Sequence, residues 1–351
     1  MTSVRTRYFV GIDLHKSMAY VYVLDGSGQR VKEFKTTFCT LEGGLGLVGL
    51  LEHWKEGGRF VVEALGLNRW FVNACQQRGL AITVANPNKL GLRNSGKKTD
   101  RRDAYELARR LRLGDIDRDA STYYPPDEQY SIRRLLRTRH VLVEQRQRLV
   151  NQLRGMMNSY YLESPGSQLY SARSIAKLRT LTFPQSHLQL VFHELIDLLE
   201  RFQRTIDTLT KEIRKCEDQP SVKRLCEEVS SVGPQTAVTL VHELGDLTRF
   251  DDAKAVASYA GLAPKVCNSA DRQHHGKIHK KGNPHLRWIL GQAAVRLMNH
   301  DERAKQWAQA RLKRMHKNKV RTALARRLLV GIFLALRRNE PFSLEKCLRA
   351  A

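Results

Sequence analysis

Four carboxylates in the first third of the chain could bind metal ions. Asp13 ends an apolar run in YFVGIDLH, and Glu63 ends another in FVVEAL. Burying a lone carboxylate is costly, so such a group tends to take a proton or bind a cation. Asp100 and Asp103 stand three residues apart in KKTDRRDAYELARR, so they share one face of a predicted helix. Clustered carboxylates suit Mg²⁺, which prefers oxygen ligands.

These carboxylates also have simpler interpretations. A carboxylate at a strand end often bonds to a turn, and acidic residues near a helix start complement the helix dipole. For Asp100 and Asp103 alone, with Thr99 as the expected N-cap, the dipole interpretation is favoured. All four together, in this order on a basic chain, favour a site where two Mg²⁺ ions, or Mn²⁺ in their place, assist phosphoryl transfer.

The first 126 residues are predicted to form the domain that positions these side chains. Alternating β-branched and aromatic residues predict two strands in 7–25 and further strands at 30–38, 59–65 and 81–86. Helices are expected at 41–56, 67–78 and 99–113. The order β-β-β-α-β-α-β-α predicts an α/β sheet with a leading antiparallel meander, which is the order of a ribonuclease-H-like fold. The YYPP sequence at 123–126 marks the end of this domain.

Residues 127–218 carry a seven-residue apolar repeat, which predicts long coiled-coil helices for oligomerisation or nucleic-acid binding. The repeat occupies Leu135, Leu142, Leu149 and Met156, and then Leu188, Phe192, Leu195, Leu199, Phe202, Ile206, Leu209, Ile213 and Cys216. The linker rich in Pro, Gly and Ser at 164–184 predicts an antiparallel pair. An internal two-helix core and a dimer seam fit this pattern equally well.

The remaining residues predict a mainly helical C-terminal domain at 219–300 and a basic helical tail at 301–351. VSSVGPQTAVTLVHELG resembles a helix-hairpin-helix, whose turn amides contact phosphate, although a plain helical hairpin fits at least as well. In the tail, Leu324, Leu328, Leu329, Ile332 and Leu336 are expected to pack on one face. Arg321, Arg326 and Arg327 would then point outward.

Charge and composition narrow the classes of function. The formal net charge of +25 and pI near 10.1 favour a polyanionic partner. The longest apolar run near a terminus, Leu328–Leu336, has nine residues, whereas a membrane span needs roughly 20. The N-terminal residues show no secretory signal, and six scattered cysteines disfavour a zinc ribbon or a disulfide scaffold. We therefore expect a cytoplasmic, nucleoid-associated protein.

Ordered motifs resemble those of a known family. Gly11-Ile12-Asp13-Leu14-His15-Lys16, Val62-Glu63-Ala64 and Lys98-Thr99-Asp100-Arg101-Arg102-Asp103-Ala104 resemble the signature of DEDD transposases of the bacterial insertion sequence 110 family, which includes pilin-gene invertases. Their N-terminal domain is similar to the Holliday-junction resolvase RuvC. Residues 232–264 and the basic GKIHKKGNPHLRWIL resemble that family's C-terminal transposase domain. The resemblance extends from about Tyr8 to Met298 and implies that Asp13, Glu63, Asp100 and Asp103 are catalytic metal ligands.

The resemblance also implies a nucleophilic serine, and Ser269 is the matching residue. The family often has Ser-Gly there, whereas this chain has Ser269-Ala270. A loop serine is usually a turn residue. Its basic surroundings, however, could hold a scissile phosphate and offset developing charge. The expected nucleic-acid contacts are Lys97, Lys98, Arg101, Arg102, Arg272, His274, His275, Lys277, Lys280, Lys281, Arg287, Arg321, Arg326 and Arg327.

Three functions are therefore compatible with the sequence. The favoured one is a transposase and recombinase that acts as a dimer or tetramer through a transient phosphoserine bond. The resemblance alone implies a structured guide RNA encoded by the mobile element. The second function is a RuvC-like, structure-selective endonuclease that uses metal-activated water. The third is a nucleic-acid scaffold without catalysis, in which the four carboxylates would be dispersed.

Overall fold

The structure is a computed structural model that describes residues 7–90, 99–269, 272–278 and 282–349. The chain forms two compact units, Met1–Tyr124 (unit 1) and Pro125–Ala351 (unit 2). Unit 2 contains all three segments that we expected after residue 126, namely 127–218, 219–300 and 301–351.

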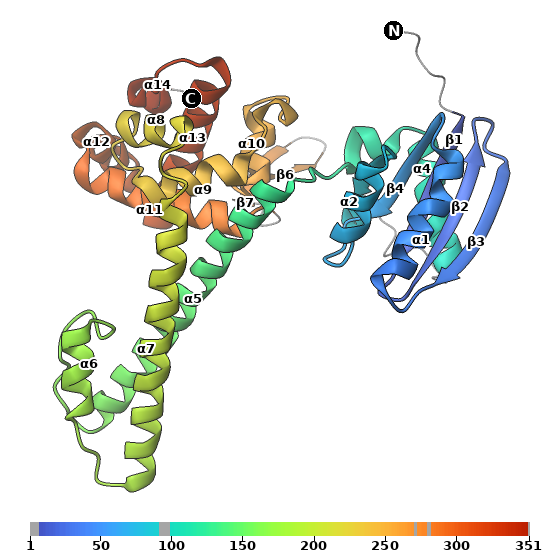
Figure 1. Ribbon diagram of the computed structural model, residues 1–351. Helices are drawn as coiled ribbons and strands as arrows, with labels where there is room; N and C mark the ends of the chain where they lie inside the picture. The colour runs from blue at the N-terminus through green and yellow to red at the C-terminus, as the bar shows by residue number, and fades with distance from the viewer. Residues whose placement is uncertain (1–6, 91–98, 270–271, 279–281, 350–351) are drawn as a thin grey trace. The chain divides into compact units, whose positions relative to one another are not determined.

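Unit 1 is a mixed five-stranded sheet with helices on both faces (Figure 1). Its strands are β1 (Tyr8–Leu14), β2 (Met18–Asp25), β3 (Arg30–Thr37), β4 (Gly58–Glu63) and β5 (Ala81–Ala85). Its helices are α1 (Leu41–Leu51), α2 (Arg69–Gln77), α3 (Pro87–Leu90) and α4 (Asp100–Arg112), with a short 3-10 helix η1 (Glu52–Trp54) and a short π-helix η3 (Ile116–Ala120).

The strand order in unit 1 is β3-β2-β1-β4-β5. Strand β2 pairs antiparallel with β1 and β3, whereas β4 runs parallel to β1 and β5. This arrangement confirms the predicted α/β sheet with its leading antiparallel meander, and it is consistent with a ribonuclease-H-like domain.

Alternation along the strands separates two apolar cores. Ile12 and Val62, which pair in register, are buried in the core that includes α1 and α2. Phe9 and Val61 belong to the core that α4 covers on the other face. Because successive side chains of a strand point to opposite faces, Asp13 and Glu63 lie on the α4 side of the sheet.

Helix α4 comes very close to the sheet at Gly11. A Cβ atom there would lie 2.0 Å from the Ala104 carbonyl oxygen and 2.5 Å from the Ala108 nitrogen. The helix backbone can therefore rest on β1 because Gly11 has no side chain. Asp13 is the next residue of β1 on this face, and Asp103 directly precedes Ala104. The contact thus brings the start of α4 to the end of β1.

Unit 2 is mainly helical, as expected. Its elements are α5 (Asp127–Ser159), α6 (Ala172–Arg179), α7 (Ser186–Arg214), α8 (Pro220–Glu228), α9 (Pro234–Leu244), η4 (Leu247–Arg249), α10 (Ala253–Tyr259), β6 (Pro264–Ser269), β7 (Arg272–Ile278), α11 (Pro284–His300), α12 (Glu302–Leu312), α13 (Lys317–Arg338) and α14 (Leu344–Arg349). Within the described parts of the chain, we find no helix with the length and apolar character needed to cross a lipid bilayer.

Helices α5 and α7 pair antiparallel as a long hairpin, with α6 near its far end (Figure 1). Arg139 donates to Thr210 Oγ1 (2.7 Å) and Arg146 to Gln203 Oε1 (2.6 Å) along the pair. Phe192 and Leu199 of the predicted repeat are buried in a core that they share with α5. The repeat therefore packs within one chain. Its alternate positions Leu188, Leu195, Phe202 and Leu209 stay half-buried.

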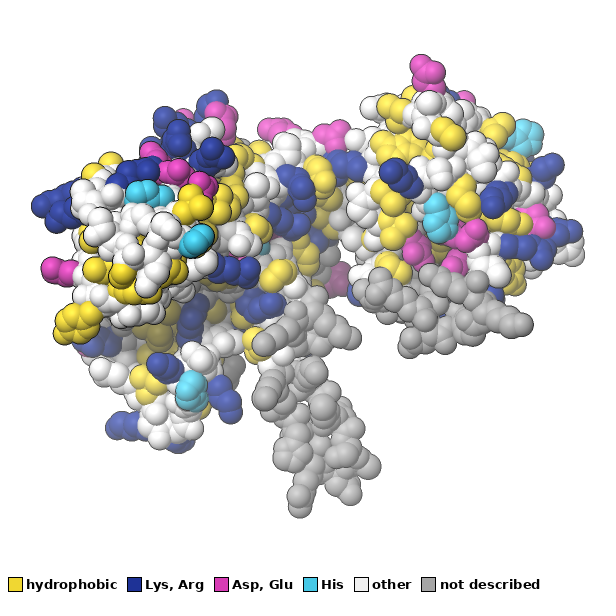
Figure 2. Space-filling model, turned by 90° about the horizontal axis from the view of Figure 1, so that it is seen from below, with side chains coloured by type: hydrophobic (Ala, Val, Ile, Leu, Met, Phe, Trp, Pro, Cys, Tyr) yellow, Lys and Arg dark blue, Asp and Glu magenta, His cyan; other side chains and the backbone are white. Residues whose placement is uncertain are grey.

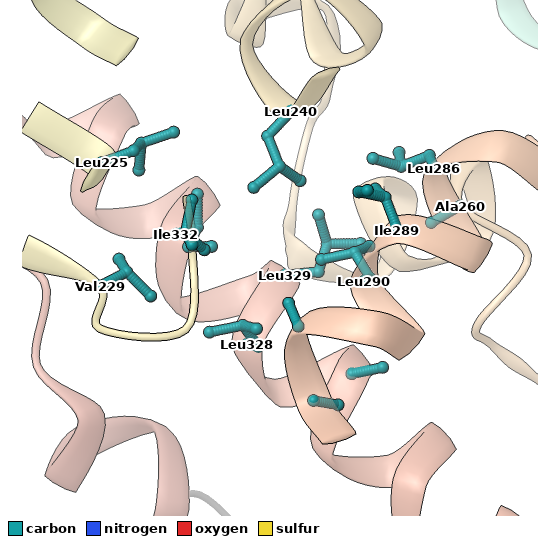
Figure 3. Close-up of a cluster of buried hydrophobic side chains, with 14 of the residues drawn as sticks. Leu225, Val229, Leu240, Ala260, Leu286, Ile289, Leu290, Leu328, Leu329 and Ile332 are labelled. Carbon is teal, nitrogen blue, oxygen red and sulfur yellow. The ribbon is translucent and has the colours of Figure 1, made fainter. Parts of the chain in front are cut away.

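The largest core of unit 2 joins α8, α9, α11 and α13. Leu225, Leu240, Leu290 and Leu329 converge there from these four helices (Figure 3). The turn that resembles a helix-hairpin-helix joins α8 to α9, with Pro234 at the first position of α9. Within the basic tail, the core includes the expected apolar face of α13, which buries Leu324, Leu328, Leu329 and Ile332.

The expectation that the tail arginines point outward is wrong for two of them. Arg321 Nε donates to the Gly291 carbonyl (3.1 Å), and Arg327 Nη1 donates to the Cys347 carbonyl (2.9 Å). Helix α13 packs against both α11 and α14, so these guanidinium groups lie between helices rather than in solvent. Half-buried Arg326 borders a groove beside α14.

We predict that Gly11→Ala destabilises unit 1 by at least about 2 kcal/mol, because the new methyl group forces α4 away from β1. Urea unfolding followed by circular dichroism measures the change. Gly46→Ala is the control, since an added Cβ on this exposed residue of α1 meets nothing within 4 Å. It should raise stability by about 0.5–1 kcal/mol. Equal stability of Gly11→Ala and wild type would contradict the close packing of α4.

Candidate metal centre and serine hairpin

Two carboxylates and a histidine meet where β1 ends. His15 Nε2 lies 3.2 Å from Asp13 Oδ2 and 3.5 Å from Asp100 Oδ1. One ligand atom from each of these residues lies within 4.8 Å of the other two. Asp13 is buried, whereas the side chains of His15 and Asp100 are almost half exposed. Figure 2 shows acidic side chains beside a histidine on unit 1.

The other two predicted carboxylates lie on the same side of the sheet. Asp103 is buried, and its charge acts on Asp13. Glu63 directly follows Val62, the register partner of Ile12, so it stands beside Asp13 on the neighbouring parallel strand. Among the described residues, the 4.8 Å group contains neither Asp103 nor Glu63. The fold thus gathers Asp13, Asp100 and Asp103, and it places Glu63 next to them by register.

The electrostatics of this cluster favour a cation. Burial is the main cause that raises the pKa of Asp13, and the charges of Asp103 and Asp100 raise it further, whereas His15 lowers it. The start of α4 brings positive dipole charge to the same place, and Thr99 Oγ1 caps it by accepting the Arg102 N–H (3.3 Å). A buried carboxylate that faces two others, with oxygen donors within reach, fits a bound divalent ion.

Basic residues border this cluster. Arg101 and Arg102 are exposed on the first turn of α4, and Arg101 Nε donates to Glu33 Oε2 (3.0 Å). The two predicted nucleic-acid contacts Lys97 and Lys98 lie outside the described residues.

His15 is a site residue that sequence reasoning missed. Its position in GIDLHK, two residues after Asp13, was a usable signal, because residues two apart in an extended chain point to the same side. Mg²⁺ prefers oxygen ligands, so a pattern of carboxylates alone does not indicate this histidine. A pattern of His, Asp and Glu together includes it.

Ser269 is the last residue of β6, not a loop residue as expected. Strands β6 and β7 pair antiparallel, with Ser269 opposite Arg272, Cys267 opposite His274 and Val266 opposite His275. This polar segment lacks the hydrophobic alternation that predicts strands, so its hairpin could not be foreseen. Among the predicted contacts, Lys280 and Lys281 lie outside the described residues, as do the side chains of Arg272, His274, His275 and Lys277.

The base of this hairpin is fixed by Glu243 of α9. Its carboxylate, fully buried, accepts two hydrogen bonds of 2.7 Å from Arg137 of α5. It also accepts one of 2.7 Å from the side chain of Asn283, and His285 Nδ1 lies 3.3 Å away. Asn283 caps α11 through the Leu286 N–H (3.1 Å), so the chain leaving β7 is tied to α9 and α5.

The segment that leads into β6 is held at the same place as the segment that follows β7. The Tyr259 hydroxyl donates to the Glu243 carbonyl (3.1 Å), and the Tyr259 carbonyl accepts from the Asn283 N–H (2.7 Å). A Cβ on Gly282 would lie 2.2 Å from the Gly261 nitrogen, so the two segments touch backbone to backbone. Arg287 on α11 spans the same gap toward the Ala260 carbonyl (3.4 Å).

Hydrogen bonds and a neighbouring charge lower the pKa of Glu243 by more than burial raises it. Burial alone raises the pKa of Glu243, but hydrogen bonds from His285, Arg137 and Asn283, together with the charge of Arg137, lower it to about 2. Glu243 therefore stays ionised across the physiological range and keeps its partners in place. Arg137 lies 106 residues from Glu243 in the sequence, and Asn283 lies 40 residues from it. No local sequence pattern therefore indicates the role of Glu243.

We predict that Asp13→Asn raises the thermal stability of the protein in the presence of a chelator, because it removes a buried charge beside two carboxylates. A raised pKa means that the native state holds the proton more tightly than the unfolded chain. The advantage of the variant should therefore grow as pH rises through the folded pKa and vanish in acid. Melting curves between about pH 4 and about pH 8 test this.

The control variant, Asp25→Asn, should change stability in the direction opposite to Asp13→Asn. Asp25 is half-buried at the end of β2, and hydrogen bonds from the Ser27 side chain and the Gln29 and Ser27 N–H groups lower its pKa. Asp25→Asn should lower stability near neutral pH and lose that effect in acid. The same pH dependence of stability in the two variants would contradict the raised pKa of Asp13.

We predict that Glu243→Gln lowers stability at neutral pH by about 3 kcal/mol, since it leaves buried donors without their anion. The pKa of Glu243 is about 2 in the folded state, against an ordinary value of 4.5. Its contribution is present above 4.5 and is lost as pH falls toward 2. Denaturant unfolding at several pH values should show the two proteins converging in acid.

Glu302→Gln serves as the control for Glu243→Gln. Glu302 is exposed and forms a surface pair with Lys305 at 3.5 Å, so its replacement should change stability by less than about 0.5 kcal/mol. A similarly small effect of Glu243→Gln would show that the buried network is not a structural anchor.

Two family models match separate parts of the chain. A transposase model of the DEDD type from the IS110 family matches residues 10–162, and a model described as Transposase IS116/IS110/IS902 family matches residues 223–313. The first range contains Asp13, Glu63, Asp100 and Asp103, and the second contains Ser269.

Curated relatives are similar over long stretches. The transposase for insertion sequence element IS1111A of Coxiella burnetii is 24% identical over 304 residues, covering 81% of this chain and 79% of the relative. The transposase for element IS1328 of Yersinia enterocolitica is 27% identical over 215 residues, 58% and 61% of the two chains. A pilin gene-inverting protein of Moraxella bovis is 32% identical over 121 residues, 34% and 38%. Together with both family models, these similarities establish that the chain belongs to the IS110 family of transposases.

Proposed function

We propose that this transposase is a recombinase that cuts and rejoins DNA through a transient phosphoserine bond at Ser269, with Mg²⁺-assisted phosphoryl transfer. The observation that carries the proposal is the gathering of Asp13, Asp100 and Asp103 around the end of β1. Carboxylates repel one another, so their close approach is explained by a cation that they share in the working enzyme.

The residues that would hold the ions are Asp13, Glu63, Asp100 and Asp103. Two divalent ions bound there would stabilise charge on the attacking and leaving oxygens of a phosphodiester. Asp13 supplies the most buried oxygen, and Asp100 an oxygen open to solvent and substrate. Arg101 and Arg102, which are exposed on the same helix, would contact the DNA backbone.

Ser269 would supply the nucleophile for the first transfer. Its Oγ forms a bond to phosphorus while the bond from phosphorus to one sugar oxygen breaks, and the serine proton ends on that sugar oxygen. Attack by a sugar hydroxyl of a second strand reverses these changes, forming a new phosphodiester and restoring the serine. The number of phosphate ester bonds is conserved, so rejoining needs no energy source.

Partners follow from this reaction. Exchange between the element ends and a target requires several active sites, so we propose a dimer or tetramer in the bacterial cytoplasm, where the DNA lies. The half-buried Leu195 and Phe202, with exposed Leu198, give α7 an apolar surface that suits such an assembly. The net charge of +25 supports binding of polyanions, and we propose that these are DNA and a structured guide RNA.

The decisive experiment incubates the full chain with element-end DNA and Mg²⁺ and searches for a serine-linked nucleotide by mass spectrometry. We expect the adduct on Ser269 in wild type, its absence in Ser269→Ala and Asp13→Asn, and at least about a thousandfold loss of strand exchange in both. Ser258→Ala, an exposed serine of α10, is the control and should remain active.

The alternative endonuclease predicts a different pattern. With water as nucleophile, Ser269→Ala still cleaves DNA while Asp13→Asn does not, and no adduct forms. Cleavage of this kind would overturn the phosphoserine proposal. Full activity of Asp13→Asn, or equal activity without divalent ions, would overturn the metal-assisted reaction itself. DNA binding by the wild type without any cleavage would favour a scaffold role.

A further inference from the structure

His15 has the geometry of a third ligand in the cluster with Asp13 and Asp100. Its Nε2 lies 3.2 Å from one carboxylate oxygen and 3.5 Å from the other. Two neighbouring ligands at right angles on an ion, each bound at about 2.1 Å, are about 3 Å apart. The histidine nitrogen is therefore already spaced from each carboxylate oxygen almost like a neighbouring ligand on a single ion.

The backbone keeps the imidazole at this place. His15 directly follows β1, and its N–H donates to the Met18 carbonyl (2.8 Å) in the turn that leads to β2. Because β1 and β2 pair along their whole length up to Leu14 opposite Ala19, the turn cannot move away from Asp13. The ring is about half exposed, so it stands at the solvent side of the buried carboxylate.

Resting on the function proposed above, we infer that His15 Nε2 is a ligand of the divalent ion that Asp13 and Asp100 bind. The site is then a mixed oxygen and nitrogen site rather than an all-oxygen one. Imidazole is a better ligand for first-row transition metals, of which Mn²⁺ is the weakest binder, than for Mg²⁺, which prefers carboxylate and water oxygens. His15 therefore increases the preference of the enzyme for Mn²⁺ over Mg²⁺.

A second role for the same geometry has a different outcome. If His15 only bridges the two carboxylates as a hydrogen-bonding group, an arriving ion displaces the ring and no metal–nitrogen bond forms. Loss of His15 would then leave the affinity for Mn²⁺ unchanged or increase it. The two roles are separated by observing the metal directly rather than the reaction.

The experiment loads the full chain with Mn²⁺ and records pulsed electron paramagnetic resonance. In wild type, we expect coupling to an imidazole nitrogen, which His15→Ala abolishes. We also expect His15→Ala to weaken Mn²⁺ binding about tenfold in titrations, with a smaller change for Mg²⁺. His15→Asp restores an oxygen ligand, so it should recover Mg²⁺ binding but not the nitrogen signal.

Control variants identify the site that gives the signal. His53→Ala removes an exposed histidine on η1, before β4 begins and therefore at the opposite end of the sheet from Glu63, and it should leave signal and affinity unchanged. Asp13→Asn should remove both. Melting curves check that each variant is folded.

The outcomes distinguish this inference from the function on which it rests. Mn²⁺ bound in an Asp13-dependent way, without nitrogen coupling and with His15→Ala unchanged, overturns the role of His15 alone. Absence of any Asp13-dependent ion, of Mn²⁺ or Mg²⁺, overturns the metal site and with it the proposed reaction.

Discussion

The contact between α4 and β1 at Gly11 is the constraint on which the acidic site depends. Without a side chain at this position, the backbone of Ala104 approaches to a distance that no Cβ would permit. The first turn of α4 then reaches the end of β1, where Asp13 is buried and Asp103 faces it. Two strands, a helix start and a missing methyl group together place the carboxylates, which lie up to 90 positions apart in the sequence.

This arrangement concentrates negative charge within a basic protein. Burial and the neighbouring carboxylates both raise the pKa of Asp13, so its ionised form is electrostatically unfavourable without a bound cation. Part of this unfavourable charge is offset by the start of α4, which Thr99 caps, and by the nearby His15. A site that is kept together in this way binds a cation without first having to assemble, and the free energy of binding is not spent on folding.

Local patterns explain how much of the fold the sequence predicts. Strand alternation and helix starts are read over a few residues, so the element order of unit 1, the Thr99 cap and the carboxylates could be foreseen. The β6–β7 hairpin lacks such a pattern. The inward bonds of Arg321 and Arg327 depend on where α11 and α14 pack, which the charge run does not reveal. His15 was overlooked because Mg²⁺ suggested oxygen ligands alone.

The serine hairpin needs support of another kind. A two-stranded hairpin is at best marginally stable by itself in water, and this one is rich in polar and basic residues. Glu243 supports this hairpin because it binds the two segments at the hairpin base, through Tyr259 and Asn283, together with Arg137 of α5 in one buried network. A buried ion pair of this type adds little net stability over an apolar core, but breaking it is expensive, so it enforces one arrangement. That property would suit the nucleophile that we propose at Ser269, because the position of such a group matters more than the stability of the strand that carries it.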